Sequence, residues 1–523
     1  MKGRAVVVAL LVVLVGSACS RSKGQNGGTF TLAGCEPPKG LVPQDHFDDA
    51  CAGQVLEGLF TRLMDYDPET HELNYALAES ITTAPDDPRT YIIRIRGGYT
   101  FHNGEPVTAQ SFVDTWNWQA RQGSVWFSGF QGFSDLNPGE GKQPTATTLS
   151  GLKAIDQLTI RFTLVSPFSN AILAFTIDDF DPMPKAFFRD PEAWGEMPIG
   201  EGPYQMDGPW QHNKVINLKR YPGYAGQPGK AERIAIHLAG GGLVDLVRGD
   251  VDVARVRADQ FDPARRELGP RSLESVVRFA THTTSALRYL GFPLNDPRFS
   301  NKETRQAFSM AIDRAAILQE SVAATPATSL LNPVLPGYRE GVCRYCHLDV
   351  AQARAKLAAA GGWHGKLIIE YVDDQVLDGQ AVADQLRENL GIDGITVMTE
   401  GVVEHVDRLN GHEMNGPFNW GPDFIWPSPE NYLEPSYQTD GWGNVTRYSN
   451  SDVDGLMAEA NAASSLSEGV RLFQQAEDVI LEDMPVIPLV YPKVSWGYST
   501  RVSDVKFTGF GCVLLETVSV SGS

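Results

Sequence analysis

The stretch FNWGPDFIWPSPENYL (residues 418–433) surrounds a carboxylate with aromatic rings. Five of its 16 residues are aromatic, whereas aromatic residues make up 10% of the whole chain. A fixed carboxylate attracts a cation, and rings that exclude water strengthen that attraction. The alternative is structural: the rings belong to a core and Asp423 caps a turn. The candidate ligand-binding residues are Asn419, Trp420, Asp423, Phe424 and Trp426.

Cysteine provides a second set of reactive side chains. In an oxidising compartment Cys35 can pair with Cys51 and Cys343 with Cys346, which would leave Cys512 unpaired, although spacing alone does not fix the connectivity. The run CRYCH (343–347) also matches the short pattern for c-type haem attachment. It lies in a loop flanked by glycine and proline with no second axial-ligand motif, so we favour a local disulfide and expect no haem.

Motifs of known enzyme classes are absent. The sequence contains no G-x-S-x-G, no H-E-x-x-H and no phosphate-binding P-loop, and no Cys/His set has the spacing of a zinc site. His102, in FHNGEP, lies at a predicted strand-to-turn position and is better interpreted as a structural or solvent-facing residue than as a base. We therefore expect a protein that is not an enzyme, without metal or cofactor, and keep a secreted enzyme as an alternative.

The N-terminus has the features of an export signal. Lys2 and Arg4 precede an apolar run, Ala5 to Val15, and then come small residues and Cys19. Eleven apolar residues are too few to span a bilayer, which needs about 20, but they suit a signal peptide. We predict a signal peptide over 1–18, and a flexible, polar tether follows over 19–27. The alternative is a plain secretory signal with a chance cysteine.

The composition limits the classes of partner. The chain has 523 residues, which predicts two or three lobes, and 42% hydrophobic and 21% charged residues, as in ordinary globular proteins. The formal net charge of −20 argues against nucleic acid and against an anionic membrane surface as partners.

Strand and helix patterns alternate along most of the chain. Strands are expected at 28–34, 90–98, 366–372 and 485–491, and helices at 52–63, 303–322, 348–360 and 468–483. Thr108 is expected to cap a helix in which Phe112, Val113 and Trp116 face the core. Such alternation predicts an α/β fold that would position the aromatic stretch.

Seven blocks in sequence order resemble the solute-binding proteins of bacterial ABC importers for peptides (family 5). They are residues 90–116, 198–210 (PIGEGPYQMDGPW), 218–224 (LKRYPGY), 288–318, 332–338 (NPVLPGY), 448–460 and 476–492. Glu201 stands where that family usually has Thr, and Tyr221 where it usually has Asn. We interpret both departures as tolerated surface substitutions, and the alternative is that they alter the local geometry or the choice of ligand.

The resemblance implies an α/β, two-lobed periplasmic-binding-protein-like fold with a hinge and an extra domain inserted in the N-terminal lobe. We expect lobe I over 28–60, 198–284 and 490–523, the inserted domain over 61–197 and lobe II over 285–489, with the hinge near 280–290 and 488–495. In such a protein the lobes close over the ligand.

The resemblance also implies a function. Trp420 to Phe424 match the family block W-x-x-D-[YF], whose acid pairs with the α-ammonium of a peptide in the cleft. The chain would capture peptides or similar amine-bearing solutes and deliver them to ABC permease subunits driven by cytoplasmic ATPases. It would be an exported monomer at the outer face of the cytoplasmic membrane or in the periplasm.

The resemblance extends to the N-terminus, because the segment before Cys19 is similar to a lipoprotein signal. It departs from that pattern at Gly16, where leucine is usual. Cys19 would carry a lipid anchor, which would be the only attachment to the membrane. Alternatives for the function are another solute (an oligosaccharide, a metal chelate or haem), a peptide sensor that feeds no importer, or a secreted enzyme.

Overall fold

The computed structural model describes residues 27–521 apart from 46–48, 240, 258–259, 261–276, 319–322, 373–377 and 424. Among the described residues the helices are α1 (Ala50–Leu59), α2 (Ala109–Gln122), α3 (Phe133–Leu136), α4 (Ala171–Ala174), α5 (Pro191–Gly195), α6 (Leu243–Arg248), α9 (Lys302–Met310), α10 (Arg314–Leu318), α11 (Val350–Ala359), α12 (Gly379–Leu390), α13 (Val402–Gly411), α14 (Pro429–Tyr437), α15 (Ser451–Asn461) and α16 (Leu466–Asp483). The strands are β1 (Thr29–Ala33), β2 (Met64–Tyr66), β3 (Leu73–Tyr75), β4 (Ala78–Ala84), β5 (Asp87–Ile95), β6 (Leu152–Ala154), β7 (Thr159–Thr163), β8 (Tyr204–Met206), β9 (Val215–Arg220), β10 (Arg233–His237), β11 (Val253–Val256), β12 (Val277–Thr283), β13 (Arg288–Gly291), β14 (Ala324–Pro326), β15 (Leu367–Val372), β16 (Ile395–Glu400), β17 (Phe418–Trp420), β18 (Val486–Ser499), β19 (Val502–Ser503) and β20 (Ser519–Val520).

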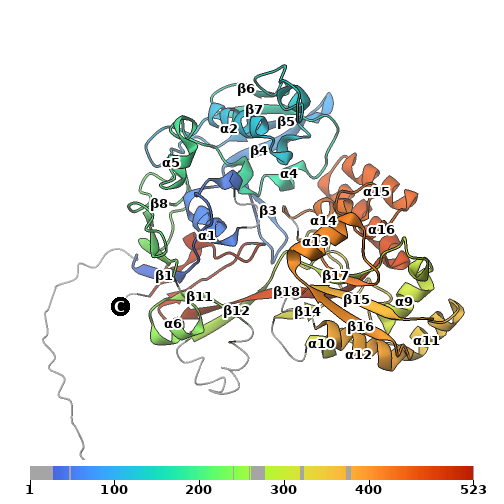
Figure 1. Ribbon diagram of the computed structural model, residues 1–523. Helices are drawn as coiled ribbons and strands as arrows, with labels where there is room; N and C mark the ends of the chain where they lie inside the picture. The colour runs from blue at the N-terminus through green and yellow to red at the C-terminus, as the bar shows by residue number, and fades with distance from the viewer. Residues whose placement is uncertain are drawn as a thin grey trace, which may run out of the picture.

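The fold is a mixed α/β architecture with two lobes (Figure 1). Lobe I contains β1, β8–β12, α1 and α6, and lobe II contains β13–β17 and α9–α16. A sheet with the order β16-β15-β17-β13-β18-β11-β1-β10-β9-β8 runs through both lobes. The pairs β15–β16, β15–β17 and β1–β10 are parallel, as expected for strands connected through helices.

The strand β18 joins the two lobes. Its first residues pair with β13 and β14 of lobe II, and from Lys493 onward it pairs with β12 of lobe I, while Ser495 to Tyr498 pair with β11. In Figure 1 it passes from the right-hand mass to the left-hand one. Beside it the chain also passes from β12 to β13, where the backbone amide of Thr284 donates to Pro492 O at 3.0 Å. Both lobes therefore share one strand.

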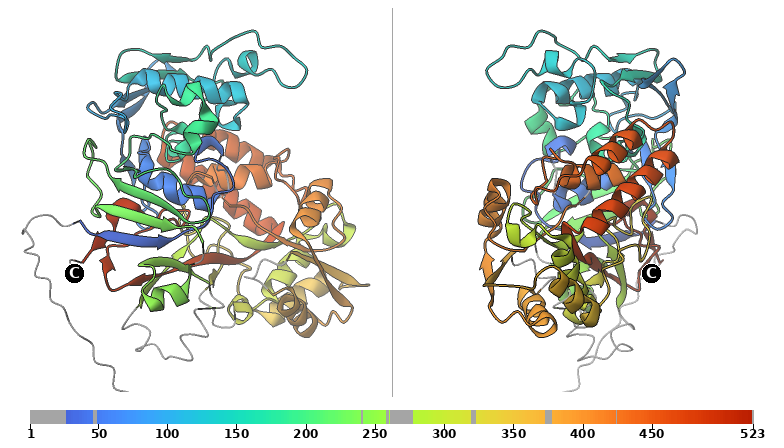
Figure 2. Two further views of the ribbon diagram at one scale, coloured as in Figure 1. Left: turned by 60° about the vertical axis from the view of Figure 1, so that its left-hand side comes forward. Right: turned by 90° about the vertical axis from the view of Figure 1, so that its right-hand side faces the viewer.

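An antiparallel sheet, β4-β5-β7-β6, forms a separate layer with α2, seen at the top of both views in Figure 2. We call β2–β7 with α2–α4 the inserted domain. Thr108 is the residue before α2, and the backbone amide of Thr108 donates to Ser111 Oγ at 3.2 Å. The predicted N-cap is therefore confirmed. Trp116 is fully buried in an aromatic core and its Nε1 donates to Phe180 O at 3.1 Å.

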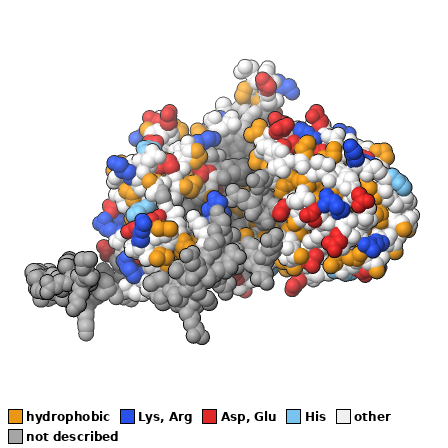
Figure 3. Space-filling view, turned by 60° about the horizontal axis from the view of Figure 1, so that its bottom comes forward, with side chains coloured by type: hydrophobic (Ala, Val, Ile, Leu, Met, Phe, Trp, Pro, Cys, Tyr) orange, Lys and Arg blue, Asp and Glu red, His pale blue; other side chains and the backbone are white. Residues whose placement is uncertain are grey.

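Each region has its own hydrophobic core, centred on Phe308 and Phe473 in lobe II, on Trp116 in the inserted domain and on Leu56 and Ile234 in lobe I. The β2–β3 hairpin also reaches lobe II, because Tyr66 Oη donates to Val334 O at 2.9 Å and His71 Nε2 donates to Pro333 O at 2.8 Å. Acidic and basic side chains are interspersed over the surface of lobe II in Figure 3.

The predicted helix over 303–322 is wrong as a single element. The structure has α9 and α10 with a break at residues 311–313. Asp313 Oδ1 accepts from the backbone amides of Ala315 and Ala316 at 3.1 Å and so begins a new helix. The buried Arg314 donates to Pro488 O at 2.7 Å, which ties α10 to β18.

The interpretation of Glu201 and Tyr221 as surface substitutions is also wrong. Glu201 is fully buried, and Tyr221 is half-buried with its hydroxyl donating to Phe101 O at 3.0 Å. His102 lies between these turns: its Nδ1 accepts from the amide of Gly200 and its Nε2 donates to Gly202 O, both at 3.2 Å. Burial lowers the pKa of His102 to about 4, so a neutral, structural histidine fits this position.

Disulfides join Cys35 to Cys51 and Cys343 to Cys346. The sulfurs of CRYCH are therefore bonded to each other, which leaves neither thiol for a thioether to haem. Cys512 is a free thiol, and burial raises its pKa to about 12. The signal peptide and Cys19 lie outside the described residues. None of the described helices is long and apolar enough to cross a membrane.

Candidate ligand-binding site

The aromatic stretch begins as a strand inside the sheet of lobe II. β17 pairs antiparallel with β13, so that Trp420 lies opposite Tyr289, and parallel with β15. Directly after it the chain turns at Gly421, where a Cβ atom would lie 1.7 Å from Leu287 O. Only glycine fits at such a close approach. The amide of Leu287 then donates to Pro422 O at 3.2 Å, which holds the turn against the segment between β12 and β13.

This turn presents Asp423 to two residues that lie far away in the sequence. Ser285 Oγ donates to Asp423 Oδ1 over 3.4 Å, and Arg288 Nη1 lies 3.8 Å from Oδ2. Both contacts are long, and the side chain of Asp423 remains 51% exposed. The sequence stretch itself contains no basic residue, so Arg288 was not foreseen.

The environment of Asp423 combines solvent access with desolvation. Desolvation by the surrounding protein raises the pKa of its carboxyl, and the charge of Arg288 and the hydrogen bond from Ser285 lower it by less. The side chain is half exposed, and its carboxyl group is nevertheless partly desolvated. Such a carboxylate can receive a hydrogen-bonded cation from solution.

Asn419 lies beneath this turn and is fully buried. Its Oδ1 accepts from the amide of Val372 at 2.7 Å and its Nδ2 donates to Val372 O at 3.0 Å. Both ends of the amide are used to fasten β17 to the end of β15. Asn419 therefore supports the loop from below through its two hydrogen bonds to Val372.

A buried charged network underlies Trp420. The ring of Trp420 lies 6.0 Å from that of His405, whose Nε2 donates to Asn419 O at 2.9 Å. His405 Nδ1 lies 2.6 Å from Glu400 Oε1, and Arg408 bridges Glu400 and Glu370. These side chains come from α13, β16 and β15, and they fix the strand that carries the candidate site.

Trp426 contacts the inserted domain. Its ring meets that of Trp126 edge-on, with centroids 5.4 Å apart at 82°. Ile425 and Trp426 also pack against the inserted domain's core. The loop after β17 therefore runs from lobe II, where Trp420 lies, to the inserted domain. Phe424 lies outside the described residues.

The structure thus places Asp423 and Trp426 on the loop that follows Trp420 at the end of β17, with Asn419 below it. Sequence reasoning missed Ser285 and Arg288. Arg288 begins the block RYLGFPLN, but the register of β13 against β17, which places it beside Asp423, leaves no signal in either segment alone.

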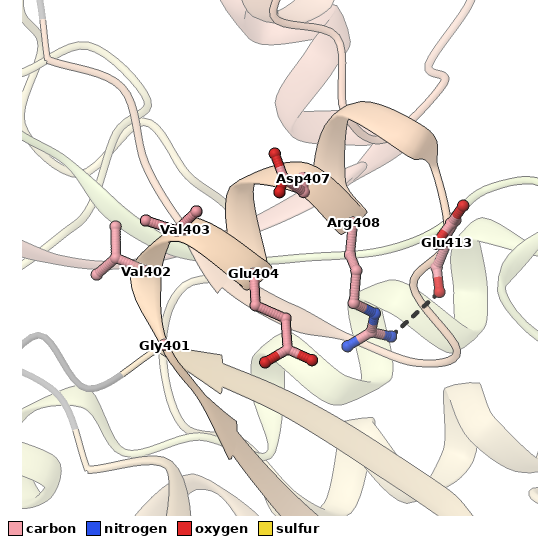
Figure 4. Close-up of a pocket in the computed structure, with 7 residues that line it drawn as sticks. All are labelled: Gly401, Val402, Val403, Glu404, Asp407, Arg408 and Glu413. Carbon is pink, nitrogen blue, oxygen red and sulfur yellow. Dashed lines mark hydrogen bonds between the residues drawn. The ribbon is translucent and has the colours of Figure 1, made fainter.

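A recess of about 740 Å³ lies along α13 (Figure 4). Val402 and Val403 are exposed there, and the acids around them are Glu404, Asp407 and Glu413. Arg408 donates to Glu413 O at 3.1 Å. None of the predicted site residues lines this recess. Within the part of the chain that the structure describes, no group of three or more His, Cys, Asp or Glu side chains could hold a metal ion.

Residues 72–444 match the model of the bacterial extracellular solute-binding proteins, family 5 (middle region). The chain therefore belongs to this family of solute-binding proteins of ABC importers. The fold, with its two α/β lobes, and the seven sequence blocks agree with that assignment.

Relatives of known type resemble the chain along its whole length. It is 24% identical to the oligopeptide-binding protein OppA of Bacillus subtilis, with 98% of each chain covered. It is 24% identical to the heme-binding protein A of Haemophilus influenzae over all of both chains, and 25% identical to the glutathione-binding protein GsiB of Escherichia coli, with 88% and 89% covered.

Solved structures share the fold. The murein tripeptide binding protein MppA in its unliganded open form has a TM-score of 0.81 at 18% identity, with 95% of this chain and 99% of that chain covered. Haemophilus influenzae OppA in complex with the peptide RPPGFSPFR has a TM-score of 0.66 at 19% identity, with 95% and 99% covered.

Proposed function

We propose that this chain captures peptides or similar amine-bearing solutes between its two lobes and delivers them to an ABC importer. The observation that carries this proposal is Asp423, a half-exposed carboxylate held by a rigid turn after β17, between Trp420 and Trp426 in the sequence. A ligand ammonium that leaves water needs such a fixed opposite charge. The named ligands of OppA and MppA support a peptide.

We further propose that the lobes close by a hinge near residues 280–290 and 488–495. Support comes from β18, whose two halves pair with different lobes. It also comes from the segment between β12 and β13, where the chain passes from lobe I to lobe II beside β18. The TM-score is higher for the open, unliganded MppA than for peptide-bound OppA, which supports an open arrangement of the lobes here.

The remaining parts of the proposal concern location and partners. We propose export, a lipid anchor on Cys19, a monomeric state, and docking on permease subunits that cytoplasmic ATPases drive. The chain would carry out no chemistry of its own, and the lack of the common catalytic motifs supports this. Lipid attachment would keep the binder next to its permease at the membrane surface.

The test is a binding titration of ligand-free protein with the free-amine tripeptides Ala-Ala-Ala and Glu-Ala-Ala. Asp423→Asn keeps the shape of the side chain and removes its charge. Removing one partner of a buried charge pair costs on the order of 2–5 kcal/mol, so the affinity should fall by at least about thirtyfold. N-acetylation of the peptide should have a similar effect on the native protein.

Two controls separate a loss of ligand binding from a loss of stability. Asp440→Asn removes an exposed carboxylate of the same lobe and should leave the affinity unchanged. The melting temperature of Asp423→Asn should move little, because a half-exposed pair at 3.8 Å contributes about 1 kcal/mol or less. If Asp423→Asn binds normally but unfolds far more readily, Asp423 is a structural cap and the site assignment fails.

A second candidate ligand is haem, because one relative that matches along the whole chain is a heme-binding protein. Adding haemin to the same ligand-free protein and recording the Soret band separates this candidate from a peptide.

A further inference from the structure

Arg288 and Asp423 place opposite charges side by side in the candidate site. Arg288 begins β13 and Asp423 follows β17, and these two strands are paired. Arg288 Nη1 lies 3.8 Å from Asp423 Oδ2. Nη1 also lies 3.3 Å from Leu287 O and 3.5 Å from Gly421 O, so the guanidinium is held over the Gly421 turn. The two side chains are 25% and 51% exposed, and both can therefore be reached from solution.

This arrangement changes which ligand the site fits. An isolated ammonium that approaches Asp423 is attracted by the carboxylate and repelled by the adjacent guanidinium. A head group that carries an ammonium and a carboxylate together meets an opposite charge at each. In a free α-amino acid head these two groups share one carbon, and standard bond lengths put the nitrogen roughly 3 Å from the nearer carboxylate oxygen. That spacing resembles the 3.8 Å between Arg288 and Asp423.

We propose that Arg288 and Asp423 together recognise a free α-amino acid head group, with the ligand carboxylate on Arg288 and the ligand ammonium on Asp423. This inference rests on the proposed function, in which Asp423 binds a ligand ammonium. It gives the highest affinity to the class of molecules whose ammonium and carboxylate stay on one carbon. Peptides joined through a side-chain carboxyl, such as γ-glutamyl peptides, belong to that class. Ordinary peptides do not, because their α-carboxyl next to the ammonium is an amide.

Two isomers test this inference. γ-Glu-Ala-Ala and α-Glu-Ala-Ala have the same atoms and the same net charge, and differ only in the carboxyl that forms the first amide. Charge-assisted hydrogen bonds to the guanidinium should make the γ isomer bind about tenfold or more tightly to the native protein in calorimetric titration. Arg288→Gln should abolish that preference while the α isomer binds as well as before or better.

Matched variants keep the result interpretable. Arg288→Lys keeps the charge without the planar fork and should retain a reduced preference for the γ isomer. Arg471→Gln removes an exposed arginine of α16 and should keep the full preference. The comparison of isomers on the native protein needs no variant, so it holds even if Arg288→Gln does not fold.

Each contrary outcome has a separate meaning. Equal affinities for the two isomers would overturn the inference and leave the proposed function standing, with Arg288 as a structural counter-ion. A γ preference that survives in a folded Arg288→Gln would place the selectivity elsewhere and also overturn it. If neither isomer binds, the proposed peptide function and the inference fail together.

Discussion

At Glu201 a carboxyl group that no solvent reaches lies against the backbone of Thr61. Its Oε1 accepts from the amide of Thr61 at 3.2 Å, whereas Oε2 has no hydrogen-bond partner. Nearby, both carboxyl oxygens of the buried Asp181 lack partners as well. Desolvation raises the pKa of both carboxyls, while the charge of Arg62 opposes the increase at Asp181. Burial therefore favours the neutral, protonated form of both carboxyl groups.

This burial predicts a pH-dependent stability. The folded state keeps the proton of Glu201 above the ordinary carboxyl pKa of about 4.3, whereas the unfolded state releases it. The contribution of Glu201 is thus most favourable below that value and is lost as the pH rises toward the raised pKa of the folded state. Glu201→Gln keeps the acceptor for Thr61 and cannot ionise. It should raise the melting temperature more at pH 8 than at pH 5.

The control is Glu459→Gln, which alters an exposed carboxylate of α15 and should shift the two melting temperatures alike. An equal shift for Glu201→Gln at both pH values would contradict a neutral Glu201.

The departure at Glu201 was visible in the sequence, but its burial was not, because the turn is covered by α1 and by His102 from other parts of the chain.

Among the elements, β17 depends on one buried amide. Asn419→Ala would leave the amide and carbonyl of Val372 without partners at the edge of β15. An unsatisfied buried polar group costs about 1–3 kcal/mol, so urea denaturation should show at least that loss. Asn415→Ala, at an exposed position just before β17, should change the free energy of unfolding by less than about 0.5 kcal/mol. Equal effects of the two substitutions would contradict the role of Asn419.

The sequence predicted the elements that repeat a simple pattern. The strands β1, β5 and β15 and the helices α2, α11 and α16 follow alternation or helical spacing with clear caps and stops. The pattern gave no sign of α13 or α14, which frame the candidate site. α14 includes Pro429 and Pro435, and α13 begins after Gly401 without a side-chain cap. Their stability comes from packing in lobe II, and the helix preferences of single residues carry no information about such packing.

The candidate site was predictable only in part for a similar reason. The block around Asp423 was recognisable because its residues are neighbours in the sequence. Arg288 and Ser285 reach it through strand pairing across more than a hundred residues. The domain boundaries remain predictions, as do the ligand-binding roles of Asn419, Trp420, Asp423, Phe424 and Trp426.

The whole molecule should change its shape when it binds ligand. If the lobes move about residues 280–290 and 488–495, closure brings lobe II toward lobe I and the inserted domain. Small-angle scattering with γ-Glu-Ala-Ala or Ala-Ala-Ala at saturation should give a smaller radius of gyration than ligand-free protein. Protein that has been denatured, dialysed and refolded provides the ligand-free reference. Equal radii at proven saturation would contradict closure.

The shared strand β18 also determines when the sheet can be completed during synthesis of the chain. Residues 486–499 follow every other described strand of the sheet that runs through both lobes, yet they form a neighbour of β13 in lobe II and of β11 and β12 in lobe I. Until the ribosome has made this segment, the sheet is interrupted between β13 and β11. The strands made earlier must therefore wait for β18 before the sheet is complete. Both lobes then acquire their central strand in one step.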